Sequence, residues 1–141
     1  MRKVEIVIAA LLIAMPASAA TVTVKSAWFR SLPAKLPAGG YFTLHNTGAQ
    51  TITLTGAESS ACGMLMLHKT ENKSGTGMMM DMPTIPVPAG SDLKFAPGGY
   101  HLMCMDPTPA MKPGRTVSVT LEFSDGTKTH VPFAVKNAKG Q

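Results

Sequence analysis

The chain has 141 residues, with 13 Lys and Arg against 8 Asp and Glu, which gives a formal net charge of +5. This length suits one domain. The basic residues form no run or stripe of the kind that contacts a phosphate backbone, so the composition argues against a nucleic-acid-binding protein.

Residues 1–19 are predicted to be a secretory signal peptide. A short basic start, MRK, precedes the apolar run VEIVIAALLIAMP, and ASAA offers small residues at a cleavage site. The run is too short to span a bilayer comfortably, and no later segment is apolar enough to do so. We therefore expect export to the oxidising periplasm, with a mature domain over residues 20–137 and a loose tail over 138–141.

Short strands separated by turn residues fill the mature chain. Segments 115–123 and 128–135 predict a hairpin, with Asp125 and Gly126 in its turn. Segment 71–77 is polar and predicts a loop, and the three prolines of MMMDMPTIPVPAG exclude a helix and disfavour a central strand. Further strands are expected at residues 21–29, 41–46, 51–58, 63–70 and 100–105. The pattern predicts an all-β protein, a single β-sandwich after the signal peptide.

Methionine is concentrated in one part of the chain. Nine of the eleven Met lie in the mature region, and eight of those nine fall between Met64 and Met105. Strand alternation places two sets of Met and His side chains each on one face: Met64, Met66 and His68, and His101, Met103 and Met105. Imidazoles and thioethers together form a soft, neutral ligand set that suits Cu(I). Zinc would more often recruit thiolates or carboxylates, and calcium and magnesium require oxygen ligands.

The spacing His68, ten residues, Met79, twenty-one residues, His101, one residue, Met103 resembles the signature of the PCu(A)C family of periplasmic copper chaperones. The segments AWFR, YFTLHNTG, LHKT, VPAG and APGGYHLM extend the resemblance over nearly the whole mature chain. It implies a cupredoxin-like β-sandwich and a binding protein rather than an enzyme. It also implies one exposed Cu(I) site, formed by His68, Met79, His101 and Met103. The cargo would go to a recipient cuproprotein, either a subunit of cytochrome c oxidase or another copper chaperone.

The ligand set has open positions. Family members commonly carry an M-x-M pair in the middle segment, whereas this chain has MMMDM, so Met78, Met80 or Met82 could replace or supplement Met79. Met66 and Met105 lie on the expected ligand faces and are either additional donors or an apolar rim. Binding of Cu(II) as well as Cu(I) stays open, and we expect a monomer.

Cys62 and Cys104 have three interpretations. Two cysteines in an exported chain often pair, and a disulfide would brace the back of the site if their strands are neighbours. The alternatives are free thiols, either buried or redox-active, and a thiolate ligand, which regular strand geometry disfavours because Cys104 faces away from His101.

Three other functions compete with copper delivery. A blue-copper electron carrier needs a Cys thiolate, two His and a weak axial Met. A thiol-disulfide reductase would want a C-x-x-C motif or an activated thiol, and the two cysteines here are far apart. A metal-free interaction domain would show no stabilisation by copper.

Overall fold

The computed structural model describes residues 21–73 and 76–141, so the predicted signal peptide at 1–19 lies outside the described residues. The described chain is all-β, as the sequence predicts, and contains no helix. None of its segments is therefore a helix that could cross a membrane. The ten strands are β1 Val22–Arg30, β2 Ala38–Asn46, β3 Ile52–Glu58, β4 Cys62–Lys73, β5 Thr76–Asp81, β6 Ile85–Val87, β7 Asp92–Phe95, β8 Tyr100–Pro107, β9 Thr116–Phe123 and β10 Lys128–Lys136.

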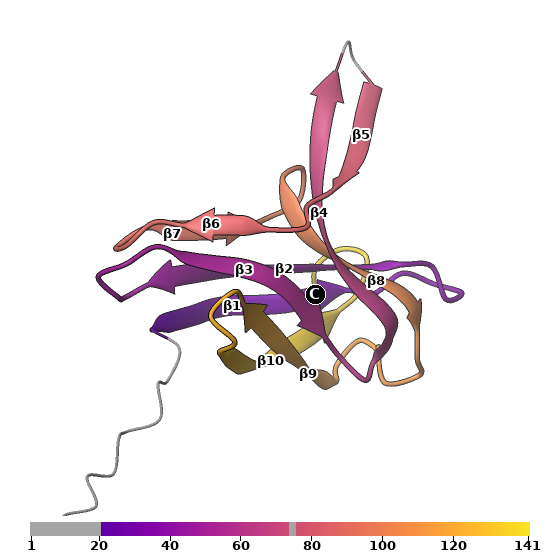
Figure 1. The fold of residues 1–141 in the computed structure, drawn as a ribbon. Helices are drawn as coiled ribbons and strands as arrows, with labels where there is room; N and C mark the ends of the chain where they lie inside the picture. The colour runs from indigo at the N-terminus through magenta and orange to yellow at the C-terminus, as the bar shows by residue number, and fades with distance from the viewer. Residues whose placement is uncertain (1–20, 74–75) are drawn as a thin grey trace, which may run out of the picture.

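All ten strands belong to one hydrogen-bonded sheet, in the order β5-β4-β8-β7-β2-β1-β10-β9-β3-β6. The sheet curls on itself, so that β3 approaches β4 although the two strands are not paired (Figure 1). The two halves of the curled sheet face one another as the layers of a sandwich, and the apolar core fills the space between them.

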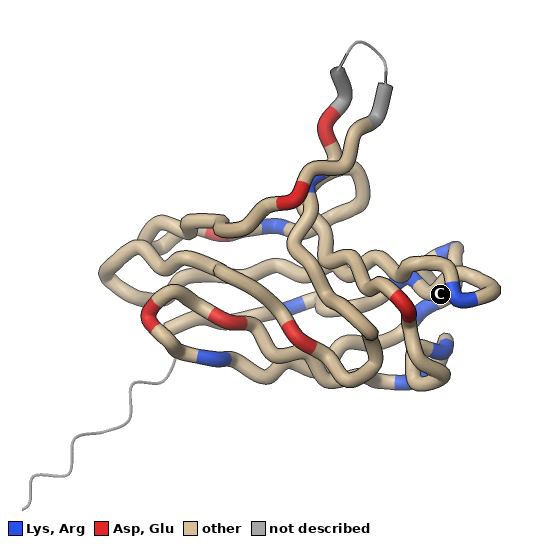
Figure 2. The backbone as a smooth tube through the Cα atoms, turned by 45° about the vertical axis from the view of Figure 1, so that its right-hand side comes forward, with Lys and Arg blue, Asp and Glu red and all other residues tan. Residues whose placement is uncertain are grey.

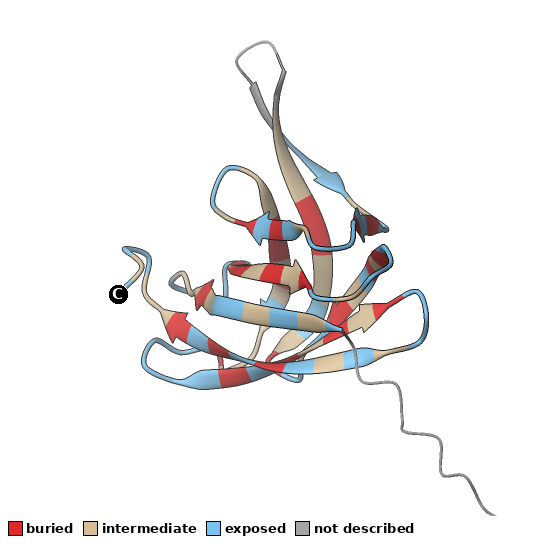
Figure 3. Cartoon of the chain, turned by 90° about the vertical axis from the view of Figure 1, so that its left-hand side faces the viewer, coloured by how far each residue is buried: buried red, intermediate tan, exposed pale blue. Residues whose placement is uncertain are grey.

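Alternation along the strands builds this core. In β9 every second residue is buried, namely Val117, Val119, Leu121 and Phe123, while the residues between them are more exposed (Figure 3). Phe133 of β10 packs against both Phe29 and Phe42, with ring centroids 5.0 and 5.8 Å apart. Burying these large rings supplies much of the hydrophobic driving force for closing the sheet.

The structure confirms the Asp-Gly turn that the sequence predicts. Strands β9 and β10 form the expected hairpin, in which Gly126 has φ +85° and the Asp125 carboxylate accepts from the backbone N–H of Thr127 at 2.9 Å. Pro86 lies in β6, which is an edge strand of the sheet. Proline lacks a backbone N–H and is therefore tolerated in an edge strand. This placement agrees with the prolines of the segment, which disfavour a central strand.

The loop prediction for residues 71–77 is wrong. Strand β4 continues to Lys73 and β5 begins at Thr76, so the two strands form a hairpin that projects from the body of the protein (Figure 1). Backbone hydrogen bonds between β4 and β5 hold the hairpin together beyond the core. Its strands therefore form without an alternation of apolar residues.

The C-terminal tail also differs from the expectation of a loose segment. The backbone N–H of Asn137 donates to the carbonyl of Gln141 at 2.8 Å, and the Asn137 side chain accepts from the N–H groups of Lys139 and Gln141. Asn side chains that accept from nearby backbone N–H groups stabilise turns, and the tail closes into one for this reason.

Candidate metal centre

Strands β4 and β8 carry the candidate ligands on one face. They pair antiparallel in a regular register from Met64 to Lys69, so three pairs of residues stand directly opposite one another: Met64 and Met105, Met66 and Met103, and His68 and His101. Directly opposite residues share a face of the sheet. We call these six side chains the outer face of the β4–β8 ladder. The intervening Leu67, Leu102 and Cys104 point inward and are buried.

His101 is buried although it belongs to the outer face, with only 5% of its surface exposed. Its Nδ1 lies 3.2 Å from the carbonyl oxygen of Gly99. Because a carbonyl only accepts, Nδ1 is assigned as the N–H donor and Nε2 carries the free lone pair. That Nε2 is buried and has no hydrogen-bond partner. Burial lowers the pKa of His101; the Gly99 hydrogen bond opposes this shift, and the neighbouring His68 adds to it. The lowered pKa favours the neutral ring, which is the form that binds a metal.

His68 meets His101 edge to face, with ring centroids 5.6 Å apart and an interplanar angle of 80°. Its Nε2 lies 2.7 Å from Oδ1 of Asp81. This distance is short enough for an ion pair. The two groups are not aligned for a hydrogen bond, however, so both ring nitrogens of His68 remain without a hydrogen-bond partner. We give the alignment more weight, because a misdirected contact does not satisfy a buried nitrogen. Unsatisfied buried nitrogens on two adjacent imidazoles are unusual, and their lone pairs are available to a metal ion.

The register of β5 distinguishes among the methionines of the middle segment. Met79 stands opposite Thr70, one step along the same face from the pair of Asp81 and His68, so it lies on the His68 side of the hairpin. Met78 and Met80 stand opposite Glu71 and Lys69, on the other side. The structure thus brings Met79 to the histidines and separates Met78 and Met80 from them.

Met82 also lies away from the histidines. Its backbone N–H donates to the carbonyl of Leu67 at 2.9 Å, and its side chain packs against the hydrophobic core. The interpretation of Met82 as a substitute ligand is not supported by this placement, because continuing the register of β5 puts residue 82 on the inward face with Leu67.

A shallow hollow of about 270 Å³ connects three of the candidate ligands, Met79, His101 and Met103. Arg30, Tyr41 and Thr70 also line it. Met79 is 63% exposed, whereas the two histidines are buried. Among the described residues no three His, Cys, Asp or Glu side chains gather to hold a metal. The site therefore suits an ion that accepts thioethers as well as imidazoles, which is a soft ion.

Sequence reasoning missed the cationic and aromatic wall beside this hollow. The Arg30 guanidinium lies 5.4 Å from the ring centroid of Trp28 and 5.6 Å from that of Tyr41. Lys136 lies 5.1 Å from the same Trp28 ring. These residues come from three neighbouring strands, and no spacing in the sequence shows that they meet. Figure 2 shows further Lys and Arg residues gathered at this end of the protein, with Asp and Glu more frequent at the opposite end.

The two cysteines form a disulfide between β4 and β8, with Cα atoms 5.4 Å apart. Cys104 is fully buried on the inward face, behind the histidine pair. Neither sulfur is a thiolate in this state, so neither is a metal ligand.

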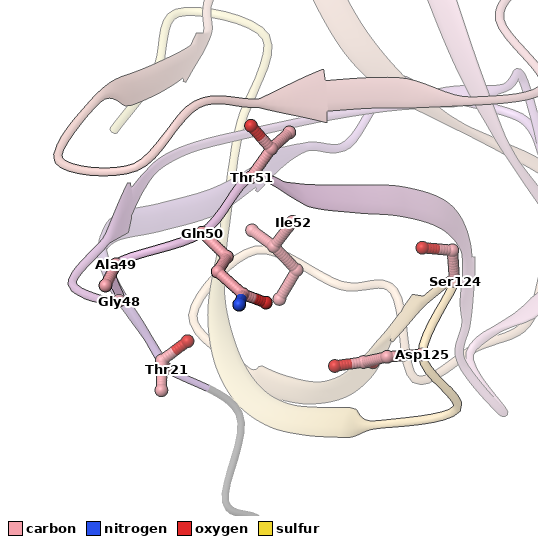
Figure 4. A pocket seen from close by; sticks show the side chains of 8 residues that line it. All are labelled: Thr21, Gly48, Ala49, Gln50, Thr51, Ile52, Ser124 and Asp125. Atoms are coloured by element: carbon pink, nitrogen blue, oxygen red, sulfur yellow. The ribbon is translucent and has the colours of Figure 1, made fainter.

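A second hollow lies outside this region (Figure 4). It is lined by residues such as Thr21, Gln50, Ser124 and Asp125, and it includes none of the candidate ligands. Among the described residues that line it, Asp125 is the only titratable one, so we assign this hollow no chemistry.

Known proteins resemble this chain in sequence. Residues 22–135 match the family described as "Putative lipoprotein LpqE-like". The chain belongs to this family. A putative lipoprotein of Leifsonia xyli subsp. xyli is 38% identical over 134 residues, covering 89% of this chain and 80% of that protein. An uncharacterized protein of Rickettsia prowazekii is 31% identical, covering 69% of this chain and 54% of that protein.

Several solved structures resemble this LpqE-like chain in fold. The apo form of DR1885 from Deinococcus radiodurans is 29% identical with a TM-score of 0.65, covering 100% of this chain and 96% of that chain. Its Cu(I) form is 28% identical with a TM-score of 0.65, covering 89% and 81%. The copper-bound PCuAC domain of PmoF2 is 20% identical with a TM-score of 0.70, covering 86% and 97%, and it shows the fold alone. Together with the family match, these structures confirm the resemblance to PCuAC proteins.

Proposed function

We propose that this LpqE-like protein is a periplasmic copper chaperone that binds one Cu(I) through His68, Met79, His101 and Met103. The observation that carries the proposal is the meeting of two buried imidazoles with two thioethers from neighbouring strands, where both ring nitrogens of His68 and Nε2 of His101 lack hydrogen-bond partners. Such a set is soft and uncharged, as Cu(I) prefers. The likeness to DR1885, which has been solved as a Cu(I) form, supports the same ion here.

Exposure suggests how the ion would leave. The histidines are buried and fixed by the β4–β8 ladder, whereas Met79 is exposed on the projecting hairpin. A partner can approach Met79 without opening the core, and a neutral thioether releases the ion without taking up a proton. We therefore place the first step of ligand exchange at Met79, with the histidines as the last donors to let go.

The charge around the hollow points to the recipient's surface. Arg30 lines the hollow, and Lys136 lies on the same wall. Beyond the predicted signal peptide the chain has 11 basic residues (13 − 2) and 7 acidic residues (8 − 1), a net charge of +4. An acidic face on the recipient would be attracted to this end of the protein. We propose the copper centres of cytochrome c oxidase, or a second copper chaperone, as the recipient.

The competing functions have less support. A blue-copper carrier and a thiol-disulfide reductase both need a reactive Cys sulfur, whereas Cys104 is fully buried within a disulfide. That disulfide is consistent with export, because such bonds persist in oxidising compartments. The match to a family described as lipoproteins also supports export.

The proposal is tested by anaerobic competition for Cu(I) with a chromophoric chelator, using the domain from residue 20 onward. One tightly bound equivalent is expected, and the double variant His101→Ala with Met103→Ala should lose it. Met78→Leu with Met80→Leu is the matched control, because these thioethers lie on the other side of the hairpin. No tightly bound equivalent in the parent domain, or a tightly bound equivalent that keeps its affinity after the His101 and Met103 changes, would refute the assignment.

A further inference from the structure

The outer face of the β4–β8 ladder continues past the histidines. Beyond His68 and His101, the next pair is Met66 and Met103, and the pair after that is Met64 and Met105. The proposed copper site uses only Met103 from these two rungs. Three thioethers on regular, paired strands are left without a role.

Packing does not explain these three side chains. Met64 is 58% exposed, and Met66 and Met105 are half-buried, while the core-facing residues of the same strands are Leu67, Leu102 and Cys104. A large apolar side chain more than half exposed contributes little to burial. Polar or β-branched residues would serve better on the open face of a strand. The choice of Met at the exposed position 64, with a second Met directly opposite it at position 105, therefore points to a chemical rather than a packing reason.

The geometry allows the three sulfurs to meet. Opposite residues in an antiparallel ladder have Cβ atoms roughly 4.5–5.5 Å apart. Successive rungs on one face are about 6.6 Å apart, from a rise of ~3.3 Å per residue. Met has three rotatable bonds and can span these gaps, so Met64, Met66 and Met105 can converge on one ion.

We propose that Met64, Met66 and Met105 form a second metal site, for a soft monovalent cation, Cu(I) or Ag(I). Three neutral thioethers offer no oxygen, nitrogen or thiolate, so the site excludes divalent zinc, calcium and magnesium. The disulfide keeps both Cys sulfurs out of competition for the ion. The site binds more weakly than the histidine site, because it lacks imidazole donors and is more exposed. The existence of this site does not depend on the proposed chaperone function, whereas the use described next rests on it.

The second site adjoins the histidine site, so it can pass an ion to or from the histidines. Met66 stands opposite Met103, which is a donor of the histidine site, so the two sites adjoin along the ladder. An ion held by the three thioethers needs to exchange only one sulfur at a time to reach the histidines. The row of thioethers is thus an entry or exit track that ends at Met64, its most exposed member.

Two measurements on the full mature domain test this site. In the first, Ag(I), a redox-stable probe, is titrated into protein with ¹³C-labelled methionine methyl groups, and the methyl shifts are followed by NMR. A first equivalent should move the signals of Met79 and Met103, and a second should move those of Met64, Met66 and Met105. Shifts of Met78 and Met80 at the second equivalent, with Met64 and Met105 unmoved, would overturn the proposal.

In the second measurement, Cu(I) affinity is determined by chelator competition for Met64→Leu with Met105→Leu. This change conserves volume and should leave the fold intact. The second equivalent should weaken about tenfold or more, equivalent to ~1.4 kcal/mol, while the first is unchanged. Met78→Leu with Met80→Leu should change neither equivalent. A second equivalent of unaltered affinity in the Met64 and Met105 variant would refute the site. If the parent domain instead binds only the weaker equivalent and shows no tight one, the chaperone proposal is refuted and the second site is not.

Discussion

Reducing the Cys62–Cys104 disulfide should destabilise the metal-free domain strongly. The two cysteines are 42 residues apart, and the loop-entropy relation for that separation gives about 4 kcal/mol. For a domain of this size, each kcal/mol corresponds to ~3–5 °C in Tm, so the expected decrease is about 12–20 °C. All four proposed ligands, from His68 to Met103, lie inside the loop that this bond closes. The same bond therefore limits how far the donors can separate in the unfolded chain.

The assay is thermal unfolding by circular dichroism, in buffer with a copper chelator, with and without dithiothreitol. The double variant Cys62→Ala with Cys104→Ala is the control, and its Tm should be low and insensitive to the reductant. Part of its loss will come from truncating a fully buried side chain, so the oxidised and reduced forms of the parent give the cleaner comparison. A decrease of less than ~3 °C on reduction of the parent would contradict the entropic reasoning.

Three further predictions follow from individual residues. Met79→Leu should weaken Cu(I) binding by about tenfold or more, measured by chelator competition, with the apo Tm unchanged because the side chain is 63% exposed. The lowered pKa of His101 means that the folded state binds fewer protons than the unfolded state, so the free energy of unfolding should fall as the pH drops below ~6.5. His101→Gln should flatten that fall in urea denaturation between pH 7.5 and pH 5.5, and an unchanged slope would contradict the assignment. Asn46 is fully buried and its amide donates to the carbonyls of Gln50 and Val87, so Asn46→Ala should cost about 1–3 kcal/mol for each carbonyl left unsatisfied, measured by the same denaturation.

The fold class was readable from the sequence because the core strands alternate. The β9–β10 hairpin has both signals that a hairpin needs, period-two apolar residues and an Asp-Gly turn, and the structure has it. The β4–β5 hairpin has neither signal. The hairpin projects from the body of the protein (Figure 1), and the polar composition of residues 71–77 predicted a loop instead.

The candidate site was predictable in part for a similar reason. Alternation within β4 and β8 was enough to place His68 with Met66 and His101 with Met103, because each set lies on one strand. Placing Met79, rather than Met78 or Met80, on the His68 side of the hairpin needed the register between β4 and β5, which depends on hydrogen bonds between two strands. The approach of Asp81 to His68 follows from that same register and left no signal in the sequence.

The alternation of β4 and β8 separates two properties that most binding sites couple. The proposed donor atoms occupy one face of these strands, and buried core residues occupy the other. An exchange of Met66 or Met105 for Asp, Ser or His would alter the preferred ion while leaving every core contact in place. Metal preference and folding stability can therefore vary independently in this scaffold. That independence makes the domain a suitable starting point for engineered sensors of other metals.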